Sequence, residues 1–411
     1  MQTQLADFIR ATPEGLEAEA ILRKCVHCGF CTATCPTYQL LGDDLDSPRG
    51  RIYLIKSALE GGPITARTRL HLDRCLTCRA CETACPSGVK YGRLVDIGRK
   101  VVESRTTRSV SDRCKRSLLG FVLPRTALFQ AALRIGQLVR AMLPRALRAK
   151  VPPPASAPGT WPAPRHERRM LALAGCVQPA LAPSINAAAA RVLDRLGISL
   201  IEAPGAGCCG ALRFHLNDQR GGLEDMRRLI DAWWPFVEHE KTEAICMTAS
   251  GCGVTVEEYT HHFANDPDDR VRAARISLLA KDVSEVIAAE APALEKLLAT
   301  RRSRGRIAFH SPCTLQHGQQ IHGVVEGLLQ KAGYELAPVA DAQLCCGSAG
   351  TYSILQPELS LQLRARKVTA LESGAPATIA TANIGCLTHL QGGTATPVRH
   401  WIELLDEALR E

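Results

Sequence analysis

The chain has 411 residues, of which 46% are hydrophobic and 22% charged, so it is long enough for two or three domains with buried cores. Its net charge of +9 suits an acidic partner protein, an anionic membrane surface or a nucleic acid equally well. Aromatic residues, which stack on single-stranded bases, make up only 4% of the chain. We therefore predict no nucleic-acid partner.

The hydropathy of the chain predicts neither a membrane span nor a signal peptide. No run of eighteen apolar residues occurs, and Asp7 and Glu14 lie where a signal peptide would be basic and then apolar. We therefore expect a cytoplasmic protein, which could sit peripherally on the cytoplasmic face of the inner membrane. Because the cytosol keeps thiols reduced, the 18 cysteines predict metal sites rather than disulfides.

Two cysteine motifs dominate residues 1–105, which we predict to form a mainly helical ferredoxin-type domain. Each motif has the spacing Cys-x2-Cys-x2-Cys-x3-Cys-Pro, which holds [4Fe–4S] clusters in two-cluster ferredoxins. Three thiolates of one run wrap one cubane, whereas the fourth lies beyond its reach and binds the other cluster. We therefore predict two [4Fe–4S] clusters, one on Cys25, Cys28, Cys31 and Cys85 and the other on Cys75, Cys78, Cys81 and Cys35.

A structural zinc site is the alternative interpretation of these motifs. Zinc takes four thiolates from paired knuckles, and two complete runs of four exceed that requirement. Nearby cations could raise the reduction potential of a cluster, although an ordinary solvated charge is the simpler interpretation of each. These cations are Arg23, Lys24, Arg49, Arg51 and Arg74.

Residues 106–150 form a basic segment with the spacing of an amphipathic helix. Apolar side chains follow one helical face at Leu128, Ala132, Ile135, Val139 and Met142. Such a helix could lie in a membrane interface beside a quinone pool, or pack on a neighbouring domain or subunit. The proline-rich stretch that follows, 151–165, predicts a linker.

One pattern of strands and helices then occurs twice, in residues 166–290 and 305–411. The strands are expected at 168–176, 198–203, 243–248, 306–313, 334–339 and 377–382. The helices between them are expected at 181–196, 220–240, 314–332 and 353–372. Alternating strands and helices predict parallel sheets with right-handed crossovers. The predicted fold class is therefore α+β overall, with a helical ferredoxin domain followed by a duplicated α/β domain.

Each repeat carries four cysteines that follow the predicted strands, including a Cys-Cys-Gly sequence. Ligands of open α/β sheets bind at the carboxyl ends of the strands, so these cysteines are further metal candidates. They are Cys176, Cys208, Cys209 and Cys252 in the first repeat, and Cys313, Cys345, Cys346 and Cys386 in the second. Buried structural thiols are the alternative, and four thiolates suit zinc, [2Fe–2S] and [4Fe–4S] groups equally. Three histidines near these cysteines could tune a cluster or relay protons, although a satisfied structural role is the simpler interpretation of each; they are His215, His310 and His317.

Together, these motifs resemble those of the iron–sulfur subunits of glycolate oxidase (glycolate dehydrogenase) complexes. The resemblance rests on CVHCGFCTATCP (25–36), HLDRCLTCRACETACP (71–86), GAGCCGAL (205–212), LCCGSAGTYS (344–353) and TANIGC (381–386). It implies that FAD-containing partner subunits oxidise glycolate to glyoxylate, and that this chain passes the electrons towards the respiratory quinone pool. The chain would then be the electron-transfer component of an oxidoreductase, with no catalytic residue or substrate site of its own.

Other functions share parts of this pattern. The equivalent subunit of a lactate or glycerol-3-phosphate dehydrogenase complex would carry the same motifs. The Cys-Cys-Gly repeats are also similar to those of heterodisulfide reductases, but Ala249 and Asn383 stand where those repeats have a further cysteine. A redox-inert scaffold is a third alternative. No nucleotide-binding glycine motif occurs, so FAD is expected on partner subunits rather than on this chain.

Overall fold

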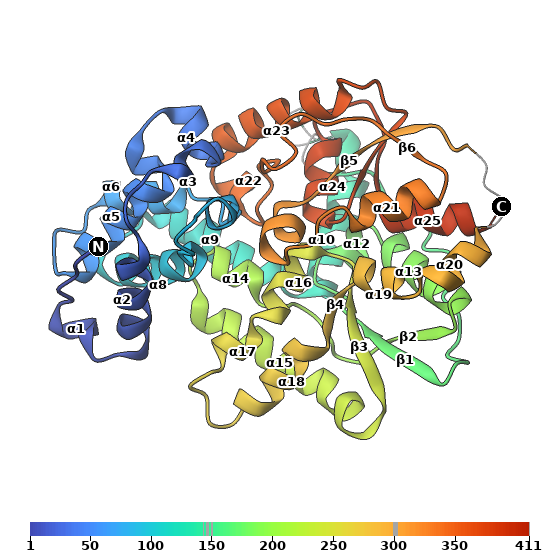
Figure 1. Cartoon of the computed structure of the whole chain (residues 1–411), viewed down its shortest axis with the longest axis horizontal. Helices are drawn as coiled ribbons and strands as arrows, with labels where there is room; N and C mark the ends of the chain where they lie inside the picture. Colours follow the sequence, from blue (N-terminus) through green and yellow to red (C-terminus); the bar gives the residue numbers. More distant parts are fainter. Residues whose placement is uncertain (143, 145–147, 149–150, 299–302, 411) are drawn as a thin grey trace.

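The computed structural model describes residues 1–142, 144, 148, 151–298 and 303–410. Helices of the N-terminal region lie to one side of two α/β units, which the middle and the C-terminal parts of the chain form (Figure 1). The basic segment predicted at 106–150 includes positions outside the described residues, namely 143, 145–147, 149 and 150.

The N-terminal region consists of short helices, three of which begin at capping side chains, those of Thr12, Ser47 and Thr65. Thr12 and Ser47 accept hydrogen bonds from the amides of Gly15 and Gly50, and a proline follows each of these two caps. The helices are α1 (Asp7–Arg10), α2 (Pro13–Lys24), α3 (Phe30–Ala33), α4 (Pro36–Leu41), α5 (Pro48–Leu59), α6 (Ala66–Asp73), α7 (Ala80–Thr83) and α8 (Tyr91–Arg105), with a 3-10 turn at Asp44–Asp46. Their shared core is filled by Leu22, Ile55, Leu59, Leu72 and Leu94.

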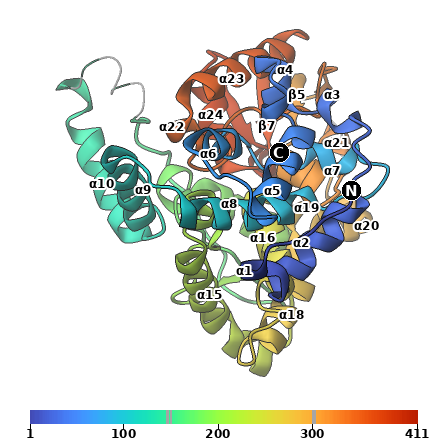
Figure 2. The ribbon, with the colours of Figure 1, turned by 90° about the vertical axis from the view of Figure 1, so that its left-hand side faces the viewer.

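Helices α9 (Val110–Val122) and α10 (Thr126–Leu138) project from the rest of the molecule, at the left of Figure 2. The bend between them is 109°. One edge of the pair rests on the first α/β unit, since Arg116 donates a hydrogen bond to the carbonyl of Leu216. The helix expected to reach Met142 ends earlier, and a 3-10 turn follows at Arg140–Met142.

No single helix in the described part of the chain is long and apolar enough to cross a membrane. The bent pair α9–α10 satisfies both criteria when its two helices are taken together, by length and composition alone.

The proline-rich segment 151–165 runs along the first α/β unit without forming a helix or strand. The indole of Trp161 donates to the carbonyl of Leu200 at 3.1 Å, and the guanidinium of Arg165 pairs with Asp194. The segment is thus held on the surface of that unit by specific contacts.

The first α/β unit has a four-stranded parallel sheet in the order β2-β1-β3-β4. Its strands are β1 (Arg168–Ala172), β2 (Ile198–Glu202), β3 (Thr242–Met247) and β4 (Ala280–Asp282). Its helices are α12 (Gln178–Leu181), α13 (Ser184–Arg195), α14 (Ala211–His215), α15 (Gln219–His239), α16 (Ser250–Glu257), α17 (Tyr259–His262), α18 (Arg270–Leu279), α19 (Val283–Ala289) and α20 (Ala291–Leu297).

The second unit repeats this topology with a parallel sheet in the order β6-β5-β7-β8. Its strands are β5 (Arg306–His310), β6 (Glu335–Leu336), β7 (Thr378–Thr381) and β8 (Val398–His400). Its helices are α21 (Val324–Lys331), α22 (Tyr352–Leu355), α23 (Pro357–Glu372), α24 (Ile384–Gln391) and α25 (Trp401–Arg410). The two matching sheets confirm the predicted α+β class with a duplicated α/β domain.

Several predicted elements are shorter or more broken than the sequence pattern indicates; the strands expected at 168–176 and 306–313, for example, end at Ala172 and His310. The strand expected at 334–339 is reduced to β6, because Pro338 cannot donate to a ladder. The helix expected at 314–332 is divided into a π-helical turn at Thr314–Gly318 and helix α21. Gly323, which precedes α21, has a left-handed backbone conformation. The helix expected at 353–372 breaks before Pro357.

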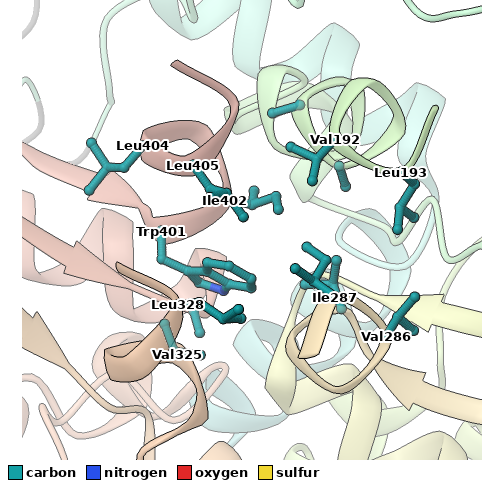
Figure 3. Packing of buried hydrophobic residues seen from close by; sticks show 14 of the residues in the cluster. Val192, Leu193, Val286, Ile287, Val325, Leu328, Trp401, Ile402, Leu404 and Leu405 are labelled. Carbon is teal, nitrogen blue, oxygen red and sulfur yellow. The ribbon is translucent and has the colours of Figure 1, made fainter. Parts of the chain in front are cut away.

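The two α/β units share one hydrophobic core, shown in Figure 3. Val192 of α13 and Ile287 of α19 belong to the first unit, whereas Leu328 of α21 and Trp401 of α25 belong to the second. Trp401 and Ile287 are fully buried. Because one core holds both units, the carboxyl edges of their sheets have a fixed relative position.

Candidate metal centres

The two ferredoxin-type motifs form loops with the same unusual backbone. The residues on either side of the second cysteine have positive φ in both motifs, with 60° at His27 and 87° at Gly29, and 54° at Thr77 and 60° at Arg79. Residues other than glycine seldom adopt this conformation, and such strain is concentrated at functional sites. Both loops therefore bend in the way that gathers closely spaced thiols around one centre.

The cysteines predicted for the first cluster surround one pocket. Cys25, Cys28, Cys31 and Cys85 all line it, and Ile52 and Val89 contribute to its apolar wall. Cys81, which the sequence assigns to the other cluster, also borders this pocket. The structure thus brings the fourth cysteine of the second motif to the first three of the first motif, and it places the two predicted centres beside each other.

The cysteines predicted for the second cluster are close enough to interact electrostatically. Burial raises the pKa of Cys81 well above its usual value, and the thiols of Cys78, Cys75 and Cys35 raise it further. Several thiolates in one buried space repel one another unless a positively charged metal group neutralises them. This donor set therefore fits an iron–sulfur cluster better than it fits free thiols.

The buried Cys75 thiol has cationic and polar groups beside it. Burial acts to raise its pKa, but the nearby guanidinium groups of Arg51 and Arg99 lower it, and so does a hydrogen bond from Tyr91. The Tyr91 hydroxyl donates to the Cys75 sulfur at 3.5 Å. Tyr91 and Arg99 lie outside both motifs, and no pattern in the sequence indicated that they approach Cys75.

The interpretation of Arg51 as a solvated charge is wrong. Its side chain is 1% exposed and lies 3.3 Å from the carboxylate of Asp46. It also donates to the hydroxyl of Thr37, and its guanidinium lies 3.9 Å from the sulfur of Cys35. Arg23 and Lys24, by contrast, are exposed, as expected of solvated charges.

The Cys-Cys-Gly turns of the two repeats are built alike. The amide of Gly210 donates to the sulfur of Cys208 at 3.4 Å, and the amide of Gly347 donates to the sulfur of Cys345 at 3.4 Å. Both glycines have positive φ, 87° and 90°. A Cβ atom at Gly210 would come within 2.6 Å of a backbone oxygen of α15, and one at Gly347 within 2.7 Å of a backbone oxygen of α23, so no other residue fits either turn.

Each repeat brings its four predicted cysteines together. In the first, Cys176 contacts Cys208, and Cys209 contacts Cys252. In the second, the sulfur of Cys313 lies 3.8 Å from that of Cys345, and Cys346 contacts Cys386. The thiols thus form two groups, one at the carboxyl edge of each sheet, as the positions of the cysteines after the predicted strands indicated.

The second ferredoxin motif packs directly on the second repeat. Burial raises the pKa of Cys78 well above its usual value, and Cys313 is the next largest cause. Leu76 belongs to one apolar cluster with Cys345 and Tyr352, and the Tyr352 hydroxyl donates to the carbonyl of Arg74. The second predicted cluster and the second repeat therefore share a buried boundary.

Two histidines near the second repeat have different roles. His317 is held at both ring nitrogens, by the Thr83 hydroxyl at 3.0 Å and by the carbonyl of Gln343 at 2.9 Å, which fits the predicted structural role. His310 is buried, yet its Nε2 has no hydrogen-bond partner among the described residues. A ring nitrogen of His310 and the sulfurs of Cys346 and Cys386 lie within 4.8 Å of one another.

The chain matches two protein families. Residues 21–89 match the 4Fe-4S dicluster domain, and residues 170–257 and 307–391 each match a cysteine-rich domain of the Cys-Cys-Gly type. The N-terminal domain thus carries two [4Fe–4S] clusters, and the chain is an electron-transfer component of an oxidoreductase.

Similar proteins cover different shares of the chain. The glycolate oxidase iron-sulfur subunit of Escherichia coli is 54% identical over all of both chains. The probable glycolate oxidase iron-sulfur subunit of Bacillus subtilis is 31% identical over 91% of this chain and 89% of its own. Lactate utilization protein A of Exiguobacterium is 26% identical over 57% of this chain and 96% of its own. The chain therefore belongs to the family of glycolate oxidase iron–sulfur subunits.

Proposed function

We propose that this chain carries electrons in a glycolate dehydrogenase complex, from FAD on a partner subunit that oxidises glycolate to glyoxylate towards the respiratory quinone pool. The observation that supports this role most strongly is the continuous series of neighbouring cysteine sites. It runs from the pocket at Cys28, through the second motif, to the cysteines of the second repeat. The choice of glycolate rests on the two relatives that match the whole chain.

The proposed ligands follow the interleaved arrangement. One [4Fe–4S] cluster is held by Cys25, Cys28, Cys31 and Cys85, and the other by Cys75, Cys78, Cys81 and Cys35. The eight cysteines of the two repeats are proposed to hold a further iron–sulfur group or zinc, since each set of four thiols is gathered at one sheet edge.

The first cluster is the proposed entry point for electrons. Cys28 is exposed, whereas Cys75 and Cys81 are buried. Val26 and Phe30, which border the same pocket, expose 69% and 65% of their surface. Exposed apolar side chains beside a redox centre suit a docking face for a partner subunit. We therefore place the FAD-containing subunit at this face.

Helices α9 and α10 are the proposed membrane contact, on the cytoplasmic face of the inner membrane. Their outer face exposes apolar side chains, including 55% of Phe121, 63% of Ile135 and 84% of Leu138. Arg113 and Arg134 add positive charge to this segment. A cationic helix with an exposed apolar face can lie in the interface of an anionic membrane, close to the quinone pool.

The first prediction concerns the substrate and the partner subunits. When the chain is purified with its partners, FAD-containing subunits should accompany it, and glycolate should reduce both [4Fe–4S] clusters. Electron paramagnetic resonance before and after the addition of glycolate measures this reduction. Phe30→Asp should abolish the co-purification while both clusters remain, because a buried carboxylate disfavours the partner interface.

The matched control is Leu16→Asp, since Leu16 is similarly exposed at 60% on α2 and does not border the pocket. Reduction by lactate as fast as by glycolate would contradict the proposed substrate. Co-purification that survives Phe30→Asp would contradict the proposed docking face.

The second prediction concerns the second cluster. Tyr91→Phe removes a hydrogen bond to the Cys75 sulfur, and such a bond stabilises the more negative, reduced cluster. A loss of about 1 kcal/mol should lower the reduction potential of this cluster by roughly 40 mV. A redox titration followed by electron paramagnetic resonance measures the shift. Tyr352→Phe is the control, because the Tyr352 hydroxyl donates to the carbonyl of Arg74 and not to a thiol. Equal reduction potentials in the parent chain and both variants would refute the hydrogen bond from Tyr91 to this cluster.

The third prediction concerns the membrane contact. Phe121→Glu together with Leu138→Glu should reduce flotation with vesicles of phosphatidylethanolamine and phosphatidylglycerol at least tenfold, because the new carboxylates are repelled by anionic lipid. Val271→Glu with Leu278→Glu is the matched control, since both residues are 69% exposed on α18. Equal flotation of the two double variants would contradict the membrane contact. Loss of partner subunits with the first variant alone, without flotation of the parent chain, would assign the face to a protein partner instead.

A further inference from the structure

His310 is a buried histidine beside two thiols, and one of its ring nitrogens is unpaired among the described residues. The residue ends β5, at the carboxyl edge of the second sheet, and it is 2% exposed. Its Nε2 has no hydrogen-bond partner in the part of the chain that the structure describes. An unpaired polar atom in such a place costs about 1–3 kcal/mol, so its retention calls for a ligand.

The other ring nitrogen of His310 is fixed by the neighbouring strand. His310 pairs with Thr381 in the β5–β7 register, and Nδ1 lies 3.0 Å from the Thr381 hydroxyl. With Nδ1 as the donor of this bond, Nε2 carries the free lone pair. Metal-binding histidines are held in the same way, because a hydrogen bond at one nitrogen orients the other towards the metal.

The first repeat lacks this pair. The position three residues before the first cysteine is Leu173 in the first repeat and His310 in the second. The position five residues before the last cysteine is Met247 in the first repeat and Thr381 in the second. All four side chains are buried. Thus a buried apolar pair in the first repeat corresponds to a buried polar pair in the second. Because burial of polar groups is unfavourable without a compensating interaction, the difference indicates a separate chemical role for the second repeat.

We propose that the second repeat holds its metal with mixed imidazole and thiolate ligands, His310 together with Cys346 and Cys386. A ring nitrogen of His310 and the two sulfurs lie within 4.8 Å of one another, so small side-chain movements would bring them to the separation of about 3.8 Å that donors have around one tetrahedral ion. A further thiolate is available from the neighbouring Cys345 or Cys313. Soft thiolates with one imidazole select zinc or an iron–sulfur group. The site of the first repeat has thiolate ligands alone.

The proposal does not depend on the identity of the substrate, and metal content and spectroscopy test it. The full chain is purified without oxygen, and its zinc and iron are measured by mass spectrometry. X-ray absorption detects a nitrogen ligand on zinc, and pulsed electron paramagnetic resonance detects nitrogen bound to iron. We expect the parent chain to contain metal beyond the two [4Fe–4S] clusters, with a nitrogen ligand.

Three variants separate ligation from structure. His310→Leu, which copies the first repeat, should lose the nitrogen signal and at least half of the metal in the second repeat, while the signals of both [4Fe–4S] clusters remain. His310→Cys should retain the metal and lose the nitrogen signal, because a thiolate replaces the imidazole. His389→Gln is the control, since His389 lies in the same repeat and its Nε2 is paired with the Ser360 hydroxyl; it should change neither.

A parent chain without nitrogen-bound metal would overturn the proposal. So would a nitrogen signal that persists in His310→Cys. If His310→Leu does not fold, the parent chain and His310→Cys still decide the question, because each is expected to carry metal.

Discussion

Thiolates gathered in a buried space repel one another, and the metal that neutralises them is the constraint on which most of this structure depends. His27, Thr77 and Arg79, which flank Cys28 and Cys78, have the left-handed backbone that bends each loop around a centre. The buried Arg51 and Arg99 supply positive charge at Cys75, and the Tyr91 hydroxyl donates to its sulfur. Arg51 is in turn paired with the buried Asp46, so the charge beside the second cluster is itself balanced. These features make sense together as the surroundings of a cluster whose charge changes during electron transfer.

The duplicated domain gives the ferredoxin domain a fixed base. Both sheets share one core around Trp401, so their cysteine-bearing edges cannot move independently. The ferredoxin domain is joined to this base at several places; among them, Leu76 packs beside Cys345, and the Arg79 guanidinium makes two short hydrogen bonds to Glu258. Electron transfer between sites depends steeply on their separation, and this rigid arrangement keeps the proposed sites side by side. The two Cys-Cys-Gly repeats differ in their distance from the ferredoxin domain's clusters, because the second ferredoxin motif packs on the second repeat.

Much of the fold and of the candidate site could be predicted from the sequence because its signals are local. The spacing of the cysteines determines which thiols one loop can present, and the alternation of strands and helices determines the parallel sheets. The predictions were less accurate where distant residues decide the outcome. Arg51 can be buried because it binds Asp46 and Thr37. The residues next to it in the sequence do not indicate these contacts. The free nitrogen of His310 likewise depends on its cross-strand neighbour Thr381, 71 residues away.

The central claim is that the two motifs exchange their fourth cysteines and hold two clusters side by side on one electron route. Electron paramagnetic resonance of the fully reduced chain tests this claim most directly, because neighbouring reduced clusters broaden and split each other's signals. We expect a spin-coupled spectrum, and we expect Cys85→Ser to perturb the cluster of the first motif while the cluster of the second motif keeps its own signal. Two independent signals in the parent chain, or loss of only the second motif's cluster in Cys85→Ser, would contradict the interleaved arrangement.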